Sequence, residues 1–204
     1  MRARGKTQIA ALALSLAAGS AAAAAAPAHA VAVFAGGCFW SMEKAFDGTK
    51  GVIEATSGYS GGTVKNPSYR QVVQGGTGHL ESVRVKYDPA KVSYAALLSV
   101  YWHHIDPTDP YGQFCDHGGN YHSAIFYGDE AEKKAADESK VALEKSGRFK
   151  APIVTVIRAA APFYPAEADH QNYAKNNPVA YAAYRIGCRR DARLEQLWGD
   201  EAPE

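Results

Sequence analysis

The stretch Ala35-Gly36-Gly37-Cys38-Phe39-Trp40 decides the expected fold and chemistry of this chain. The residues before it, 31–34, form a short apolar run of the kind that makes a buried strand. Two glycines then permit a tight turn and a close approach of the backbone. Apolar residues recur at helical spacing from Phe39 to Phe46, so we predict a helix whose first turn carries Cys38.

A cysteine at the start of a helix has unusual chemistry. Free N–H groups and the helix dipole favour an anion there, so a thiol with an ordinary pKa of about 8.5 can ionise at lower pH. Phe39 and Trp40 would place an apolar wall beside the sulfur. We therefore predict a nucleophilic thiolate at Cys38; the alternative is a buried structural cysteine followed by core aromatics.

The first thirty residues have the pattern of a secretory leader. Arg2, Arg4 and Lys6 form a basic start, residues 9–26 are almost wholly apolar or small, and Ala28-His29-Ala30 is an A-x-A cleavage site. An uncleaved membrane anchor is the alternative. We expect residues 1–30 to be a cleaved signal peptide and residues 31–204 to form one mature domain, periplasmic or secreted, with no stable membrane association.

Charge and size narrow the class of protein. Losing the three basic residues of the leader changes the net charge from +1 to −2, and no basic stripe runs along the chain. We therefore expect no nucleic acid partner. The remaining chain is long enough for a single domain with a sizeable core, and we expect it to be a monomer.

Strand-like and helix-like stretches alternate in the mature chain without regular β-α-β order. Apolar or alternating runs predict strands at residues 52–59, 79–87, 121–127 and 153–157. Apolar faces predict helices at residues 68–74, 93–102, 129–146 and 192–198. Residues 106–120, with two prolines and three glycines, predict irregular surface structure, and later prolines argue against long helices after residue 161. We predict one α+β domain, a two-layer sandwich in which helices pack on a mixed sheet with long coil segments.

Four polar side chains are candidates to join Cys38 in a reactive site. Glu81 lies where a glycine-rich loop enters a strand, and Tyr69 lies in a short helix. Asp116 lies within the irregular segment, and Tyr121 directly follows it. Singly, each fits an ordinary role as a surface carboxylate, a turn former or a core tyrosine. Together they supply a nucleophile, an acid and two hydroxyl donors, the groups that a reductive site needs.

The motifs that carry these residues resemble one known family, peptide methionine sulfoxide reductase A. The similarity lies in Gly37-Cys38-Phe39-Trp40, Gly58-Tyr59-Ser60-Gly61-Gly62, Asn66-Pro67-Ser68-Tyr69, Gly78-His79-Leu80-Glu81, and Asp116-His117-Gly118 followed by Tyr121. It extends from about Val33 to Trp198. The resemblance implies thiol-dependent reduction of methionine-S-sulfoxide to methionine, which repairs oxidised proteins; protein-bound and free sulfoxide both remain possible substrates.

The resemblance also implies a role for each polar residue of the site. Cys38 attacks the sulfoxide sulfur and becomes a sulfenic acid. Glu81 protonates the oxygen as a carboxylic acid that burial keeps neutral. The hydroxyls of Tyr69 and Tyr121 bind this oxygen, and Asp116 supports them.

The two aromatic residues after Cys38 match the family's pocket for the methyl group of the substrate. Phe39 and Trp40 would hold that group in one orientation. A single chiral pocket implies selectivity for the S epimer, since one enzyme handles each epimer of the sulfoxide.

A second thiol must condense with the sulfenic acid on Cys38. Here the chain departs from the family, because the glycine-rich tail with two recycling cysteines found in some members is missing. Cys188 and Cys115 are the candidates, and we favour Cys188 because nearby prolines and glycines would let it swing towards Cys38. We expect no cofactor and no metal, and an external thiol reductant such as a thioredoxin-like protein.

Two functions of other classes stay open at this point. One is a cysteine hydrolase or acyltransferase in which His79 or His117 activates Cys38; the sequence has no motif for that pairing. The other is a non-catalytic periplasmic binding domain with a structural Cys115–Cys188 disulfide, which leaves the double glycine and Glu81 without a purpose.

Overall fold

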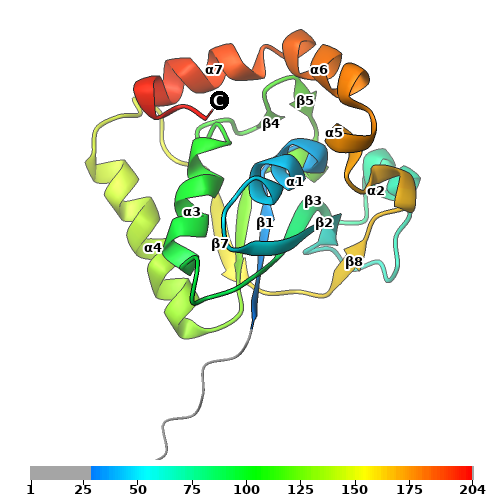
Figure 1. Cartoon of the computed structure of the whole chain (residues 1–204), viewed down its shortest axis with the longest axis horizontal. Coiled ribbons are helices and arrows are strands. Elements are labelled where there is room, and N and C mark those ends of the chain that lie inside the picture. Colours follow the sequence, from blue (N-terminus) through cyan, green and yellow to red (C-terminus); the bar gives the residue numbers. More distant parts are fainter. Residues whose placement is uncertain (1–28, 204) are drawn as a thin grey trace, which may run out of the picture.

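A computed structural model describes residues 29–203 of the chain, so nearly all of the expected signal peptide lies outside the described residues. Six strands form one mixed sheet in the order β7-β6-β1-β3-β2-β8 (Figure 1). The strands are β1 (Ala30–Ala35), β2 (Val52–Ser60), β3 (Leu80–Tyr87), β6 (Ala124–Tyr127), β7 (Val156–Ala159) and β8 (Phe163–Pro165). Only the β6–β7 pair is parallel within this sheet. The predicted α+β class with a mixed sheet is confirmed.

Helices and short elements complete the described chain. The helices are α1 (Phe39–Asp47), α2 (Tyr69–Gln74), α3 (Tyr94–His103), α4 (Glu130–Lys145), α5 (Tyr173–Asn176), α6 (Pro178–Gly187) and α7 (Arg190–Trp198). The short elements are β4 (Gly112–Gln113), β5 (Asp116–His117) and the 3-10 turns η1 (Gly119–Tyr121), η2 (Ala168–His170) and η3 (Gly199–Glu201). No helix among residues 29–203 combines the length and apolar composition that a membrane span requires.

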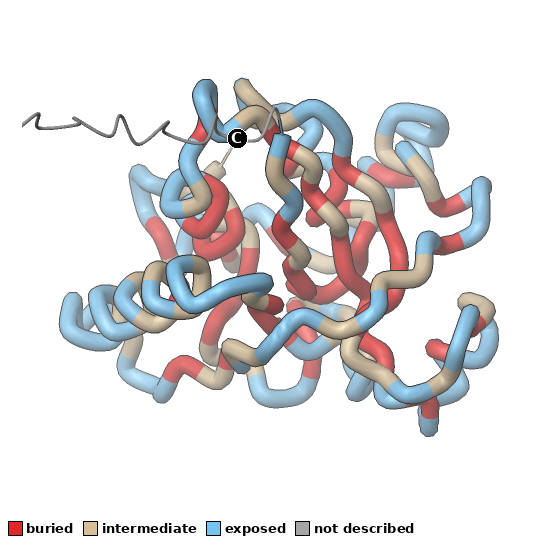
Figure 2. Tube along the Cα trace, turned by 90° about the horizontal axis from the view of Figure 1, so that it is seen from below, coloured by how far each residue is buried: buried red, intermediate tan, exposed pale blue. Residues whose placement is uncertain are grey.

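The main core lies between the sheet and the layer of long helices. Phe34 of β1 stacks on Phe46 of α1 and on Tyr101 of α3, with ring centroids 5.1 and 5.2 Å apart. Trp102 of α3 donates a hydrogen bond to Ser139 of α4 at 3.0 Å. In Figure 2 the buried residues gather at the centre of the molecule, and the outer loops and helix faces are exposed. This packing makes the predicted two-layer sandwich.

One error of the sequence-based prediction affects the site. The prolines after residue 161 led us to expect no long helix there, but α6 has ten residues. Pro178 occupies the start of α6, where a missing N–H leaves no hydrogen bond unmade and the fixed φ suits a helix. The proline therefore begins the helix, and α6 carries side chains towards Cys38.

The junction between β1 and α1 depends on its two glycines. A Cβ on Gly36 would lie 2.7 Å from Sδ of Met42 and 2.8 Å from Cγ2 of Ile105. Gly37 has a φ of +79° and would clash with the side chain of Gln113. The chain can therefore pass from the central strand into α1 within two residues, and Cys38 becomes the N-cap residue of that helix.

Candidate active site

Cys38 is the free thiol among residues 29–203, and its side chain is only 6 % exposed. Burial raises the pKa of the thiol to about 12, and the negative charge of Glu81 adds to the effect. The expectation of a lowered pKa is therefore wrong for this state of the protein. Removing the thiol from water outweighs the favourable position at the helix N-terminus.

Glu81 is the second residue of β3, and its carboxyl group is buried beside the start of α1. Its Oε2 accepts a hydrogen bond from the backbone N–H of Phe39 at 3.1 Å. Its Oε1 is buried and has no hydrogen-bond partner in the described protein. Burial raises the pKa of Glu81 to about 8, although the Phe39 N–H opposes this shift. At neutral pH Glu81 is therefore a carboxylic acid, with Oε1 free to carry a proton to a substrate. Because Glu81 carries no charge at pH 7, burial is then the main effect that disfavours the Cys38 thiolate.

The two predicted tyrosines lie next to Glu81. The Tyr121 hydroxyl lies close to that of Tyr69 and lowers the pKa of Tyr69, against the effect of burial. Burial raises the pKa of both hydroxyls, and the charge of Glu81 is the next cause for each. Tyr69 begins α2, whose N-cap Ser68 accepts a hydrogen bond from the Gln71 N–H. Both hydroxyls therefore remain protonated and can donate hydrogen bonds near the free oxygen of Glu81.

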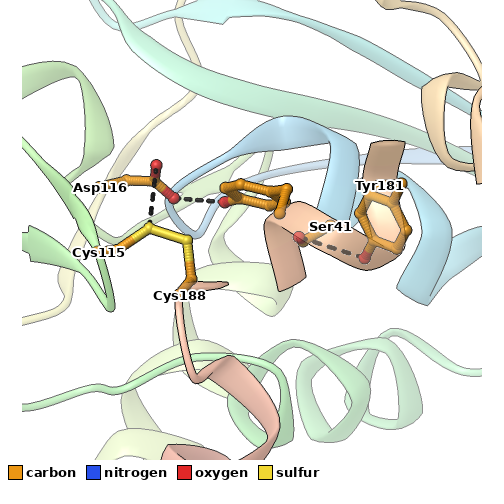
Figure 3. Close-up of a disulfide and its surroundings, with 6 residues drawn as sticks. Ser41, Cys115, Asp116, Tyr181 and Cys188 are labelled. Carbon is orange, nitrogen blue, oxygen red and sulfur yellow. Dashed lines mark hydrogen bonds between the residues drawn. A yellow bond between two sulfur atoms is a disulfide. The ribbon is translucent and has the colours of Figure 1, made fainter. Parts of the chain in front are cut away.

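Asp116 contacts a tyrosine that sequence reasoning missed. The hydroxyl of Tyr184 on α6 donates to Oδ2 of Asp116 at 2.5 Å, beside the disulfide drawn in Figure 3. The Tyr184 hydroxyl also lies close to the Cys38 thiol, where it lowers the pKa of that thiol and so opposes the effect of burial. Burial raises the pKa of Asp116, and the bond from Tyr184 opposes that shift. One hydroxyl thus lies between the thiol and a carboxyl group.

Phe39 and Trp40 belong to an aromatic cluster beside the thiol. The ring of Trp40 stacks on Tyr173, with centroids 3.6 Å apart and planes at 8°. Its Nε1 donates to Nδ1 of His170 at 3.2 Å. The His170 ring also contacts Phe39 at 5.2 Å and Tyr69 at 4.3 Å between centroids. The predicted apolar wall is therefore completed by two residues from the end of the chain, which the sequence did not indicate.

A buried carboxyl group, Glu43, anchors that late segment to α1. Both of its oxygens accept the backbone N–H of Asn172, at 3.1 and 3.0 Å. Oε2 also accepts the Ser57 hydroxyl at 3.0 Å. Since Asn172 directly precedes Tyr173, this contact holds Tyr173 over the Trp40 ring. The residues missed by the sequence prediction meet the site only through such long-range contacts.

The comparisons with known proteins agree with this geometry. Residues 30–202 match the model of the peptide methionine sulfoxide reductase family. The chain belongs to this family. It is 49 % identical over 174 residues to the peptide methionine sulfoxide reductase MsrA of Bacillus licheniformis, covering 85 % of this chain and 96 % of the relative. It is 52 % identical over 168 residues to the MsrA of Halalkalibacterium halodurans, covering 82 % and 96 %.

Solved structures of the family have the same fold. Methionine sulfoxide reductase A of Corynebacterium diphtheriae superposes with a TM-score of 0.66 at 32 % identity, over 76 % of this chain and 78 % of that one. Mxr1 of Saccharomyces cerevisiae in reduced form gives a TM-score of 0.66 at 28 % identity, over 74 % and 87 %. This reductase therefore has the MsrA activity, reduction of peptide methionine-S-sulfoxide to methionine.

The other two cysteines of the reductase differ from the arrangement we expected. We expected Cys188 to be a free thiol that swings towards Cys38, but Cys115 and Cys188 form a disulfide with Cα atoms 4.9 Å apart (Figure 3). The β4–β5 turn carries Cys115 and the end of α6 carries Cys188, and these two segments of the chain lie side by side. Among the described residues, Cys115, Asp116 and Cys188 also form a group of possible metal ligands, but the disulfide removes both thiolates. Which cysteine attacks the sulfenic acid stays a prediction.

Neither rival function fits the reductase. His79, a candidate base for a hydrolase, contacts the backbone with both ring nitrogens: Nε2 lies 2.7 Å from the Val64 carbonyl oxygen, and Nδ1 accepts the Gly62 N–H at 3.1 Å. It therefore has no free nitrogen for the Cys38 thiol. The disulfide of the proposed binding domain is present, but it adjoins a complete set of reductase side chains.

Proposed function

We propose that Cys38 and Glu81 together remove the sulfoxide oxygen. The Cys38 sulfur attacks the sulfoxide sulfur while Glu81 donates its proton to the oxygen, and the Tyr69 and Tyr121 hydroxyls hold that oxygen. The attack forms a bond between the two sulfur atoms. The OH group then passes from the substrate sulfur to the Cys38 sulfur, so the sulfur–oxygen bond and the new sulfur–sulfur bond both break and methionine leaves with the electron pair on its sulfur. The carboxyl of Glu81 carries this proposal, because it is buried, neutral at pH 7 and has one unpartnered oxygen.

The thiol proton also needs a destination, because Cys38 is protonated in the free enzyme. The Tyr184 hydroxyl interacts with both the Cys38 thiol and the Asp116 carboxylate. We propose that the thiol proton passes to the Tyr184 oxygen as the Tyr184 proton moves to Oδ2 of Asp116. Protonated Asp116 then returns the proton that Glu81 has given up, so the reduction step needs no net proton from solvent.

The methyl group of the substrate would lie against Phe39 and Trp40. Phe39 is 1 % exposed and Trp40 is partly buried, and stacking on Tyr173 keeps the Trp40 ring in one orientation. A rigid apolar wall on one side and the Glu81 oxygen on the other distinguish the methyl group from the oxygen of a sulfoxide. This is the physical basis that we propose for selection of the S epimer.

Two successive reactions with cysteine thiols return the sulfenic acid on Cys38 to a free thiol. We propose that the Cys188 thiolate attacks the Cys38 sulfur, releases water and forms a Cys38–Cys188 disulfide. Cys115 then attacks the Cys188 sulfur, which frees Cys38 and leaves the Cys115–Cys188 bond. The presence of that bond together with a free Cys38 supports this scheme, since it is the state after both exchanges.

An external dithiol must reduce the Cys115–Cys188 bond before the next turnover. Cys115 is exposed, so a protein reductant can reach its sulfur. We propose that the mature enzyme works outside the cytoplasm after removal of residues 1–30 and that its reductant is a thioredoxin-like protein of the same compartment. The basic start, apolar run and cleavage site of the leader support the location.

One experiment tests the proposed chemistry and recycling together. The reduced mature enzyme receives one equivalent of a peptide with methionine-S-sulfoxide, and quenched samples are mapped for disulfides by mass spectrometry. A transient Cys38–Cys188 bond that converts to Cys115–Cys188 is the expected result. A transient Cys38–Cys115 bond would exchange the roles of the two cysteines. A Cys115–Cys188 bond that resists reduction before the substrate is added, in an enzyme that still forms methionine, would make the pair structural, and the reductant would then act on Cys38 directly.

A further inference from the structure

The two segments that carry the disulfide are linked a second time, without a covalent bond. Phe114 directly precedes Cys115, and Arg190 follows Cys188 by two residues. The guanidinium carbon of Arg190 lies 4.1 Å from the centroid of the Phe114 ring. We propose that Arg190 is a positioning residue of recycling, whose stack on Phe114 keeps Cys115 and Cys188 adjacent while both are thiols. This inference rests on the proposed recycling, in which the two cysteines react in turn.

The backbone beside each of these cysteines has an unusual conformation. Four residues of the described chain other than glycine have a positive φ. Two of them are asparagines, which tolerate this left-handed region, whereas the other two are Phe114, with a φ of +60°, and Arg189, with a φ of +52°. Residues of these types keep such a conformation only where the surrounding structure holds them. The segments on both sides of the disulfide are therefore held by contacts other than the disulfide itself.

Arg190 has no ion pair that would account for its burial. Its side chain is 1 % exposed, and no carboxylate among residues 29–203 forms a salt bridge with it. Nη2 donates to the His104 carbonyl oxygen at 2.8 Å, whereas Nη1 is buried and makes no hydrogen bond in that part of the chain. A buried guanidinium without a carboxylate is costly. Its stack on Phe114, out of water, is the contact that favours this position.

The helix that begins at Arg190, α7, is fixed to the core by bonds that involve no sulfur atom. Three of its side chains bind the segment 104–106: Arg190 the His104 carbonyl oxygen at 2.8 Å, Arg193 the Asp106 carboxylate at 2.7 Å, and Trp198 the Ile105 carbonyl oxygen at 3.2 Å. Reduction of the disulfide leaves all three contacts in place. Phe114, stacked on this fixed helix, then keeps Cys115 beside Cys188.

Adjacent thiols make the second exchange of the recycling fast. Groups that are held close react as if at high local concentration, because little freedom is lost when they meet. When Cys188 has bonded to Cys38, the clamp keeps Cys115 within reach of the Cys188 sulfur. Asp116 accepts the Tyr184 hydroxyl, which lies close to the Cys38 thiol. Both cysteines are therefore held beside the nucleophile that they must restore.

The test is the reduction potential of the Cys115–Cys188 pair in the mature chain with Cys38→Ser, where no other disulfide can form. The protein is equilibrated at pH 7 in buffers of a reduced and oxidised dithiol, and its thiols are counted by alkylation and mass spectrometry. Arg190→Met keeps an unbranched side chain and removes the guanidinium. We expect the equilibrium constant for disulfide formation to fall about tenfold, the contribution of one desolvated contact between a cation and a ring, which raises the potential by about 30 mV.

A second variant and a matched control keep the result decisive. Phe114→Asn removes the ring, places a residue that tolerates a positive φ, and should raise the potential even if Arg190→Met does not fold. Arg148 stacks on Trp198 at the other end of α7, 5.3 Å from the ring centroid. Arg148→Met should lower the thermal stability and leave the potential unchanged. An unchanged potential in the folded Arg190→Met and Phe114→Asn variants would overturn the proposal, and so would an equal shift in the control.

A kinetic measurement separates this inference from the proposed recycling. With Cys38 present and one equivalent of sulfoxide, Arg190→Met should lengthen the lifetime of the Cys38–Cys188 bond about tenfold, from the loss of the same contact. Methionine formation in the same samples is the internal reference. A shifted potential, with no Cys38–Cys188 bond in the wild type, would support the clamp and end the proposed recycling. An unshifted potential together with that transient bond would end the clamp alone.

Discussion

The two sulfur centres of this reductase lie in opposite environments. Cys38 and its acid Glu81 are almost fully buried on the central sheet and α1, whereas Cys115 is exposed at the β4–β5 turn. Burial keeps Glu81 protonated at neutral pH and so makes it an acid. Exposure makes the disulfide accessible to an external dithiol. The reduction step therefore requires exclusion of water, and the recycling step requires access to a partner.

The same two centres are connected through one hydrogen-bonded pair. Asp116 directly follows Cys115, and Tyr184 lies one helical turn before Cys188. The disulfide therefore ties together the two segments whose side chains meet at 2.5 Å near Cys38. Substitutions at the buried centre and at the exposed centre should therefore affect different steps of the reaction.

The largest effect is expected for Cys38→Ser. A hydroxyl is a far poorer nucleophile than a thiol at neutral pH, and no other free thiol lies in the described chain when the disulfide is formed. All methionine formation should stop, as measured by chromatography of the products after one equivalent of sulfoxide. Activity close to the wild type would place the nucleophile at another cysteine.

Loss of the exposed centre should affect turnover and spare the first reduction. In Cys115→Ser or Cys188→Ser, steady-state activity with a thioredoxin-like protein should nearly vanish, because the relay is broken. Formation of the first equivalent of methionine should persist in both, since that step needs only Cys38. If both variants turn over at the wild-type rate with the protein reductant, the disulfide plays no part in recycling.

Glu81→Gln tests the acid at the buried centre. Glutamine keeps the shape and can donate a hydrogen bond, but it cannot transfer a proton. The single-turnover rate should fall by roughly 10² to 10⁴, the usual contribution of a general acid, with little change in substrate binding. Rapid-quench kinetics against substrate concentration separate the two quantities. Equal rates in Glu81→Gln and wild type would end the acid assignment.

A smaller effect is expected for Tyr184→Phe, which removes the hydroxyl between Cys38 and Asp116 and keeps the ring against Trp40. Single-turnover reduction should slow by about tenfold, because proton transfer would then need water. Disulfide formation between Cys115 and Cys188, followed by mass spectrometry, should be unaffected. A Tyr184→Phe enzyme with the wild-type rate would show that the thiol proton leaves by another route.

Much of the fold was predictable because its signals are local. The glycine pair before Cys38, the alternation in residues 79–87 and the cap at Ser68 are short-range features, and β3, α1 and α2 form as expected. The strand predicted at 153–157 begins later, at Val156. α6 was missed because a proline was taken to end a helix when it begins one.

The residues that sequence reasoning missed have no local signal. Tyr184, His170 and Glu43 reach the site through contacts more than sixty residues apart, with Asp116, Trp40 and Asn172 respectively. The direction of the Cys38 pKa was wrong for the same reason. A helix N-terminus is visible in the sequence, but the degree of burial depends on how the late segments cover the thiol.

In the proposed reaction a neutral Glu81 acts as the acid while Cys38 starts as a protonated thiol. The most direct test is the single-turnover rate between pH 6 and 9.5 in Cys115→Ser/Cys188→Ser, where Cys38 is the one cysteine. The acid form of Glu81 is lost as pH rises through its raised pKa of about 8. The rate should therefore be constant below that pH and fall about tenfold per pH unit above it. This fall should be absent when Glu81→Gln is added to the same double cysteine variant. A rate that rises steadily from pH 7 to 9 would contradict the proposed acid role of Glu81, because thiolate formation would then control the reaction.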